Sequence, residues 1–196
     1  MKLYVDRAGT APSPRRVRIL LAEKGLEVPY ERLAIHEENR TAEFRRKNPI
    51  STLPVLELDD GTCISESIAI CRYLEELHPE PSLFGATPEE RARIEMWTRR
   101  IELYLYLSIE FANEKVMPKE VAARFRRDAR GMMKLLDGEL ADRRFVAGDR
   151  YSIADAFALS ALDFGTAYVA GFEIPEKRTH LLRWHREVSA RPSARA

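Results

Sequence analysis

The sequence is poor in cysteine: Cys63 and Cys71 are the only two among 196 residues. So few cysteines exclude a disulfide framework and a cysteine-rich zinc site. An excess of charge of one sign is also missing, because 32 Lys and Arg balance 31 Asp and Glu. We therefore expect no nucleic-acid partner. No apolar run is long enough to span a membrane, since the most apolar stretch, residues 153–172, contains Asp155 and Asp163.

Motifs that are sufficient for catalysis are missing as well. No G-x-S-x-G, Walker or G-x-G-x-x-G motif occurs, and none of the four histidines has metal-ligand spacing: His36, His78, His180 and His185. We expect no metal site, so any chemistry must use a reactive group of a bound molecule. The composition, 45% hydrophobic and 32% charged, is typical of a folded soluble protein. The N-terminus lacks the apolar core of a signal peptide, and we expect a cytoplasmic protein.

The first 78 residues alternate between strand-like and helix-like patterns. Apolar runs predict strands at residues 2–6, 28–35, 53–58 and 63–64, the last two joined by a hairpin turn. Three helices are predicted: one with Ser13 as its N-cap and Pro14 as its first residue, one that opens at Thr41, runs through Phe44 and ends before Asn48-Pro49, and one from Ser67 to Leu77. The expected order is βαβαββα, an α/β domain over residues 1–78.

Residues 79–86 contain prolines and are expected to form a linker. Beyond them we find no strand pattern. Thr87-Pro88-Glu89-Glu90 and Ser152-Ile153-Ala154-Asp155 both have the pattern of a capping box at a helix start. Helical spacing of apolar residues continues to about Phe111, resumes after Pro118 and recurs around Trp184. Residues 87–196 are therefore predicted to form an all-helical bundle.

The turn from Gly9 to Arg16 is the first candidate site. A strand that leads through a proline-rich turn into a helix N-terminus creates an anion site, because free N–H groups and the positive end of the helix dipole face outward. Ser13 or Thr10 could direct a hydroxyl at a thiolate there. The alternative is that Ser13 only caps the helix.

The second candidate site combines Leu53-Pro54 with Glu66 and Ser67. A proline at the start of a strand leaves the preceding backbone extended and unpaired. If the Leu53–Pro54 peptide is cis, the Leu53 N–H and C=O are available to an extended peptide. Glu66 and Ser67 lie at a helix start, where they offer a carboxylate to an ammonium group and a hydroxyl to a carboxylate. The alternative for these two residues is a plain helix cap.

These motifs together resemble one family. Residues 48–56 (Asn-Pro-Ile-Ser-Thr-Leu-Pro-Val-Leu), then Asp60-Gly61, then residues 65–70 (Ser-Glu-Ser-Ile-Ala-Ile) are similar to the glutathione-binding core of glutathione S-transferases. Residues 145–149 with residues 152–155 resemble the C-terminal folding motif of that family. The resemblance covers essentially the whole chain. It implies a thioredoxin-like domain followed by a helical domain, with glutathione as co-substrate.

The resemblance also implies roles for individual residues. Leu53, before a cis Pro54, would pair its backbone with the cysteinyl part of glutathione, and Glu66 and Ser67 would hold the γ-glutamyl end. Thr52 occupies the position at which many relatives have a lysine that faces the glycyl carboxylate; Ser51 is the neighbouring alternative for that contact.

The residue that activates the thiol is expected to be a hydroxyl other than tyrosine. Val5, Asp6 and Arg7 occupy the stretch in which tyrosine-type relatives place their tyrosine, and Tyr4 lies inside the predicted strand. By the resemblance, this points to the serine-, cysteine- or asparagine-using branches of the family, and we favour Ser13 as activator. Thr10 is the alternative. The turn lacks a cysteine, so mixed-disulfide chemistry at that position is unsupported.

The expected activity is conjugation of the glutathione thiolate to small apolar electrophiles, in a detoxifying enzyme. Tyr104 and Phe111 are candidate residues of the electrophile pocket, with a place in the bundle core as the alternative. Two other functions compete: a glutathione-dependent reductase of disulfides or peroxides, and a non-catalytic binding or regulatory module. Family members are usually homodimers, and we expect the same here.

Overall fold

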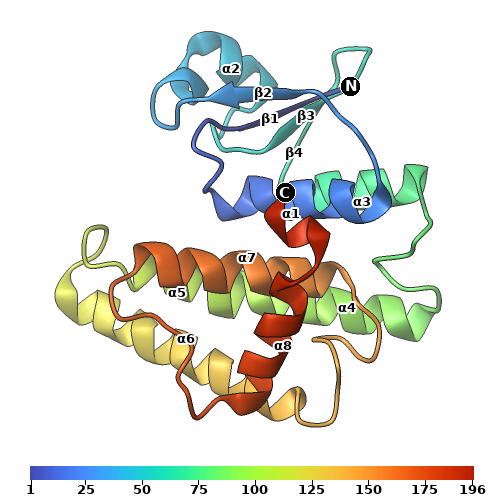
Figure 1. The fold of residues 1–196 in the computed structure, drawn as a ribbon. Coiled ribbons are helices and arrows are strands. Elements are labelled where there is room, and N and C mark those ends of the chain that lie inside the picture. Colours follow the sequence, from blue (N-terminus) through green and yellow to red (C-terminus); the bar gives the residue numbers. More distant parts are fainter. The chain divides into compact units, whose positions relative to one another are not determined.

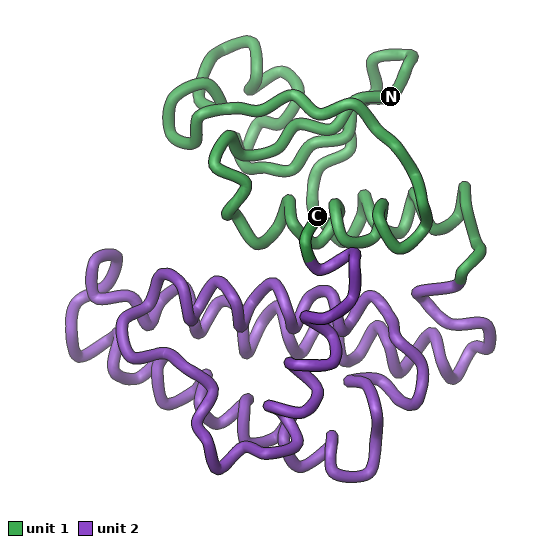
Figure 2. The backbone as a smooth tube through the Cα atoms, viewed as in Figure 1, with its two compact units in different colours: residues 1–81, 195–196 green, residues 82–194 purple.

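A computed structural model describes all 196 residues of the chain (Figure 1). The chain divides into two compact units (Figure 2). The N-terminal unit comprises Met1–Pro81 together with Arg195–Ala196, and the C-terminal unit comprises Ser82–Ala194. None of the helices combines the length and the apolar character that are needed to cross a membrane.

The N-terminal unit has the predicted order of strands and helices, with one short 3-10 helix (η1) added. Its elements are β1 (Lys2–Asp6), α1 (Pro12–Lys24), β2 (Tyr30–Leu33), η1 (Glu38–Arg40), α2 (Ala42–Lys47), β3 (Val55–Glu57), β4 (Cys63–Ser65) and α3 (Ser67–Leu77). The strands form one sheet in the order β2-β1-β3-β4. Strand β1 is parallel to β2 and antiparallel to β3, which is antiparallel to β4.

Helices cover both faces of this sheet. Figure 1 shows α1 and α3 side by side on one face and α2 on the opposite face. Side chains alternate between the faces along each strand. Tyr4 and Val55 therefore lie on the α2 face, where they form a small apolar cluster with Phe44. The side chains of Leu3 and Leu56 point to the opposite face, toward α1 and α3, and are fully buried.

Helix α1 begins two residues earlier than the sequence pattern predicts. Ala11 is the N-cap, Pro12 and Pro14 are the first and third helical residues, and Ser13 lies between them. The prediction of Ser13 as N-cap is wrong. The helix starts earlier because the Asp6 carboxylate, at the end of β1, accepts the Ala11 N–H and so caps the helix from outside the local sequence.

Other boundaries in this unit follow the local signals. Helix α3 spans Ser67–Leu77 as predicted, the Thr41 hydroxyl caps α2, and Gly25 ends α1 with a left-handed φ of 63°. Strand β2 is shorter than the predicted residues 28–35, because only Tyr30–Leu33 pair with β1. It is an edge strand, and apart from its last residue it is exposed.

The C-terminal unit contains helices and no strand, as predicted; an isolated bridge joins Phe145 and Gly148. Its elements are α4 (Pro88–Arg100), the π-helix η2 (Ile101–Tyr106), α5 (Leu107–Phe111), α6 (Lys119–Glu139), α7 (Ile153–Tyr168), α8 (Thr179–Ser189) and the 3-10 helix η3 (Pro192–Arg195). Helix α7 packs against α4, and α6 packs against α5 and α8. Residues 88–111 are helical throughout, but the spacing of apolar residues does not reveal the π-helical turn in the middle.

The predicted capping box at the start of α7 is present and centres on Asp155, which is completely buried. Its carboxylate accepts the Val146 N–H at 2.9 Å, the Trp184 indole N–H at 2.8 Å and the Ser152 N–H at 2.9 Å. Burial raises the pKa of Asp155 to about 6. One carboxylate thus joins the loop at residues 145–149, α7 and α8.

Part of the stretch expected to be a linker packs into the C-terminal unit. Leu83 and Phe84 are buried, and the Leu83 C=O accepts the Ile153 N–H at 3.0 Å. This contact attaches the segment to the start of α7.

Candidate active site

The predicted binding residues gather at one edge of the N-terminal sheet, where β1 ends, β3 begins and β4 ends. Val55 pairs with Tyr4 on one side and with Ser65 on the other. Leu53 and Pro54 directly precede Val55. Because both pairings are antiparallel, these two residues lie beside Glu66, which follows β4, and beside the end of β1. Residues from separate parts of the sequence therefore meet at this edge.

The peptide bond between Leu53 and Pro54 is cis, as expected. Pro54 is buried and Leu53 is half-buried, with its side chain packed against the apolar cluster on the α2 face. The Leu53 N–H and C=O form none of the chain's own hydrogen bonds. They offer one donor and one acceptor to the backbone of a bound peptide.

The segment before Leu53 is held by two buried asparagines to which sequence analysis assigned no role. Asn48 donates through Nδ2 to the Thr52 C=O at 2.9 Å and to Thr52 Oγ1 at 3.0 Å. Asn39 donates through Nδ2 to the Ser51 C=O at 2.6 Å. Since Thr52 Oγ1 accepts the Asn48 hydrogen, the hydroxyl hydrogen of the exposed Thr52 is free for an acceptor outside the chain.

Glu66 and Ser67 lie at the start of α3. Glu66 is the N-cap and has a φ of 70°, which is uncommon for a residue other than glycine and often occurs at functional sites. It is exposed, and its carboxylate forms no hydrogen bond or ion pair within the chain. The buried Ser67 accepts Arg16 Nη1 at its Oγ over 3.4 Å. Arg16 follows Ser13 by one turn of α1, so the starts of α1 and α3 lie at the same edge.

Ser13 keeps both of its donors free at the start of α1. Asp6 is 1% exposed, and its Oδ2 accepts the Thr10 N–H at 2.6 Å and the Ala11 N–H at 3.0 Å. The prolines on either side of Ser13 have no N–H. Neither the N–H nor the hydroxyl of the half-buried Ser13 has a hydrogen-bond partner in the chain. One residue of the first turn therefore supplies both a backbone and a side-chain donor.

The turn between β1 and α1 is also held by Arg18, which donates through Nη2 to the Gly9 C=O at 2.8 Å. Burial lowers the pKa of Arg18, and the nearby Asp6 carboxylate opposes that change. Gly9 has a φ of 71°, a conformation that glycine adopts without strain. A buried acid and a buried base thus fix this turn from two sides; neither was identified from the sequence.

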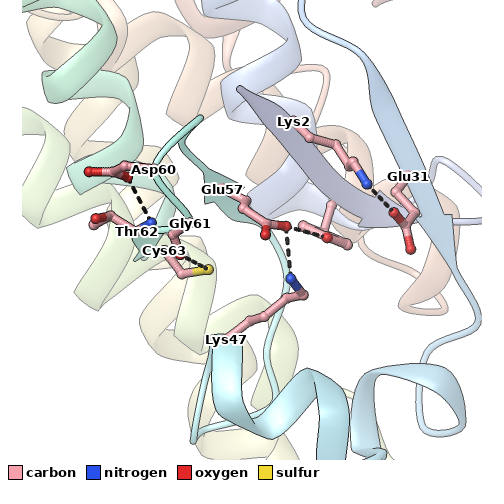
Figure 3. A network of polar contacts seen from close by, with 9 residues as sticks. Lys2, Glu31, Lys47, Glu57, Asp60, Gly61, Thr62 and Cys63 are labelled. Atoms are coloured by element: carbon pink, nitrogen blue, oxygen red, sulfur yellow. Dashed lines mark hydrogen bonds and ion pairs between the residues drawn. The ribbon is translucent and has the colours of Figure 1, made fainter.

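Tyr4 lies on the α2 face and belongs to a different polar network. Figure 3 shows Glu57 and Lys47 of this network. Its hydroxyl donates to Glu57 at 2.5 Å, and Lys47 Nζ donates to the same carboxylate at 2.8 Å. Burial, with the hydrogen bond to Glu57 as the second cause, raises the pKa of Tyr4. A tyrosine that activates a thiol needs its hydroxyl free, so this arrangement fits the expectation that Tyr4 is not the activator.

The two aromatic residues expected at an electrophile pocket have different surroundings. Tyr104 lies in the π-helix η2 and is 61% exposed. Phe111 is half-buried, and its ring centroid lies 5.2 Å from that of Phe125 in α6. Tyr104 is exposed to a ligand, and Phe111 packs against Phe125 while part of its surface stays exposed.

The cysteines and acidic residues provide no reactive centre of their own. Burial raises the pKa of the half-buried Cys63 thiol and of the fully buried Cys71 thiol. Thiols of raised pKa are poor nucleophiles at neutral pH. No group of three or more His, Cys, Asp or Glu side chains is arranged to hold a metal ion.

Comparison with known families gives a match to each half of the chain. The family model described as glutathione S-transferase, N-terminal domain, matches residues 10–77. The model described as glutathione S-transferase, C-terminal domain, matches residues 96–192. The two matches follow the division into an N-terminal and a C-terminal unit.

Two individual proteins show the same similarity over nearly the full length, and a third shows it over part of the chain. Glutathione S-transferase 2 of Saccharomyces cerevisiae is 37% identical, over 100% of this chain and 88% of the yeast protein. The crystal structure of a glutathione S-transferase domain-containing protein of Marinobacter aquaeolei superimposes with a TM-score of 0.90 and 40% identity, over 98% of this chain and 99% of the other. Elongation factor 1-gamma of Equus caballus is 30% identical over 64% of this chain and 29% of its own length.

Proposed function

Since the chain belongs to the glutathione S-transferase family, we propose that it conjugates glutathione to small apolar electrophiles. One observation carries this proposal. At a single sheet edge the chain presents the unpaired backbone of Leu53, the free carboxylate of Glu66, the hydroxyl of Ser67 and the free donors of Ser13. A chain that served only as a scaffold would not need to keep this set of unpaired polar groups.

Each group matches one part of glutathione in the proposed complex. The Leu53 N–H and C=O pair with the cysteinyl backbone, beside Pro54. Glu66 binds the γ-glutamyl ammonium group, and the Ser67 hydroxyl, polarised by Arg16, donates to the γ-glutamyl carboxylate. The Thr52 hydroxyl faces the glycyl carboxylate; it is a neutral donor directed outward by Asn48. Residues 1–78 are the proposed glutathione-binding domain.

Ser13 is the proposed activator of the thiol. A thiol with a pKa of about 8.5 is only a few per cent ionised at neutral pH, and lowering that pKa by about two pH units requires about 2.7 kcal/mol. A hydroxyl that donates to a charged acceptor contributes about 1.5–3 kcal/mol, and a helix N-terminus contributes up to about 1 kcal/mol. The Ser13 hydroxyl and the start of α1 together supply this amount, so no general base is needed.

The reaction that follows is a substitution at the electrophile. With a chloronitroarene, the glutathione thiolate forms the new C–S bond, the C–Cl bond breaks and chloride leaves, while the thiol proton has already passed to solvent. Residues 87–196 are the proposed helical domain that contributes the electrophile pocket, with Tyr104 and Phe111 as lining residues. The aromatic character of these residues favours apolar substrates. A cytoplasmic homodimer with a detoxifying role completes the proposal.

Two other functions compete with the transferase. The turn that carries Ser13 lacks a cysteine, so a reductase would act through a second glutathione molecule and not through a protein thiol. The similarity to elongation factor 1-gamma, a protein not named as an enzyme, favours a non-catalytic module. The complete set of ligand-binding groups favours the transferase over that module.

One set of assays distinguishes the three functions. The purified chain is incubated with glutathione and either a chloronitroarene or a model disulfide, and glutathione binding is measured by calorimetry. The transferase consumes the chloronitroarene, the reductase consumes the disulfide, and a non-catalytic module consumes neither. Turnover of the disulfide alone would replace the proposed function by the second one.

A further inference from the structure

We infer that Asn39 and Asn48 are positioning residues for glutathione binding. They hold the segment Ile50–Thr52 so that the backbone of Leu53 stays outside the sheet and available to the ligand. This inference rests on the proposed function, because it assigns a structural cause to the glutathione affinity of the same site.

Every polar group of Asn48 forms a hydrogen bond within the chain. It is 1% exposed, and its N–H donates to the Phe44 C=O at 2.9 Å, which fixes it at the end of α2. Its side-chain Oδ1 accepts the Ile50 N–H at 3.2 Å, and its C=O accepts the Ser51 N–H at 2.9 Å. Its Nδ2 binds both oxygens of Thr52. The three residues after Pro49 are therefore held by one buried amide residue.

Asn39 acts on the same segment from a different element, η1. It is 5% exposed; its Oδ1 accepts the His36 N–H at 2.7 Å and its Nδ2 donates to the Ser51 C=O at 2.6 Å. Ser51 has a φ of 63°, in the left-handed region, which a serine adopts only when its surroundings hold it. The bond from Asn39 is the contact that holds the carbonyl of this residue.

These bonds fix the chain up to the residue before Leu53. The carbonyls of Ser51 and Thr52 are both taken by asparagine side chains, and strand pairing starts only at Val55. Leu53 thus lies between a fixed segment and the first paired residue, with its N–H and C=O unbound. Without the asparagine donors, Ser51 returns to the extended region and the Leu53 backbone changes direction. We expect this change to weaken glutathione binding. Thiol activation should be unaffected, because the proposed activating groups lie on α1 and not in this segment.

The experiment uses Asn39→Asp and Asn48→Asp in the full chain. Each substitution keeps the shape and the Oδ1 acceptor but removes the Nδ2 donor. We expect the Kd for glutathione from calorimetry, and the KM for glutathione, to rise about tenfold. The kcat at saturating glutathione should stay within about twofold of the wild type. Asn39→Ala, which introduces no charge, should give the same rise in Kd.

Asn113→Asp is the matched control. Asn113 lies in the C-terminal unit, and its Oδ1 accepts the Lys115 N–H at 3.0 Å, so this variant also keeps an acceptor and loses a donor. It should bind glutathione with the wild-type Kd. If the Asn48 variant does not fold, the two Asn39 variants decide, because Asn39 holds a single carbonyl of the segment.

The outcomes separate this inference from the proposed function. A wild-type chain that does not bind glutathione contradicts the proposed function, and the inference falls with it. A wild-type chain that binds, with folded asparagine variants of unchanged Kd, overturns the inference alone. A fall in kcat as large as the rise in KM also overturns it, since that pattern indicates general damage to the fold and not a loss of positioning.

Discussion

The carboxylate of Asp6 accepts the backbone N–H of Thr10 at 2.6 Å, immediately before helix α1. This bond occupies the backbone N–H of Thr10, which is the alternative to Ser13 as activator of the thiol. Ser13, the proposed activator, keeps its N–H and its hydroxyl unpaired. A buried acid at the end of β1 therefore determines which backbone N–H groups at the helix start are left for a ligand.

Substitution of Ser13 tests the proposed activator. Ser13→Ala removes a hydroxyl donor to the thiolate, and we expect the pKa of the bound glutathione thiol to rise by about one to two pH units. Thr10→Val should leave that pKa unchanged. The measurement is a pH titration of the thiolate absorbance of the glutathione complex. A rise in Thr10→Val with none in Ser13→Ala would transfer the role to Thr10.

Removal of the Asp6 carboxylate should destabilise the N-terminal unit. Asp6→Ala leaves the N–H groups of Thr10 and Ala11 without acceptors, which costs about 1–3 kcal/mol of unfolding free energy. Asp60→Ala is the control, because Asp60 accepts a single N–H, that of Thr62, in an exposed hairpin. Urea unfolding should show a loss below about 1 kcal/mol for the control. Equal losses in the two variants would refute the capping role of Asp6.

The network around Glu57 predicts a dependence of stability on pH (Figure 3). The hydrogen bond from Lys47, followed by that from Tyr4, lowers the pKa of Glu57 below its usual value. A carboxyl whose pKa is lower in the folded state stabilises the fold above its unfolded pKa of about 4.3, and this contribution disappears as the pH falls through the lowered folded value.

Glu57→Gln should therefore lower the unfolding free energy by about 1 kcal/mol at neutral pH, and by less as the pH falls below about 4. Urea unfolding at a series of pH values provides the measurement. Glu31→Gln is the control, because the Lys2–Glu31 pair is about half-exposed on both sides and such surface pairs contribute little. A loss that stays constant from neutral to acid pH would contradict the role of the Glu57 charge.

Substitution of Asp155 should have the largest effect on stability. Asp155→Ala leaves the buried N–H groups of Val146, Ser152 and Trp184 without acceptors, which costs about 3 kcal/mol or more. Thermal unfolding measures the loss. Asp149→Ala, at an exposed residue of the neighbouring loop, should change stability by about 0.5 kcal/mol or less. A similar melting temperature for the two variants would show that the buried hydrogen bonds contribute little.

Local signals predicted most of the fold. The boundaries of α3, the capping box at Ser152 and the stop at Gly25 all depend on residues close in sequence, so a pattern reveals them. The start of α1 was misplaced because its cap comes from Asp6, five residues before the N-cap and in another element. Propensity rules that consider only adjacent residues do not include such a contact.

The supporting residues of the site could not be predicted for the same reason. Asn39 and Ser51 are 12 residues apart, and Arg16 and Ser67 are 51 apart. Their contacts follow from the packing of separate elements, η1 with α2 and α1 with α3, which the sequence pattern does not specify. The pairing of Tyr4 with Glu57 depends in the same way on the register between β1 and β3.

The pKa of the glutathione thiol bound to the wild-type chain tests the central claim most directly. The account predicts that thiolate absorbance titrates about two pH units below the ordinary thiol value of about 8.5. It would be contradicted by a bound thiol that titrates at the value of free glutathione, or by the absence of binding at millimolar glutathione.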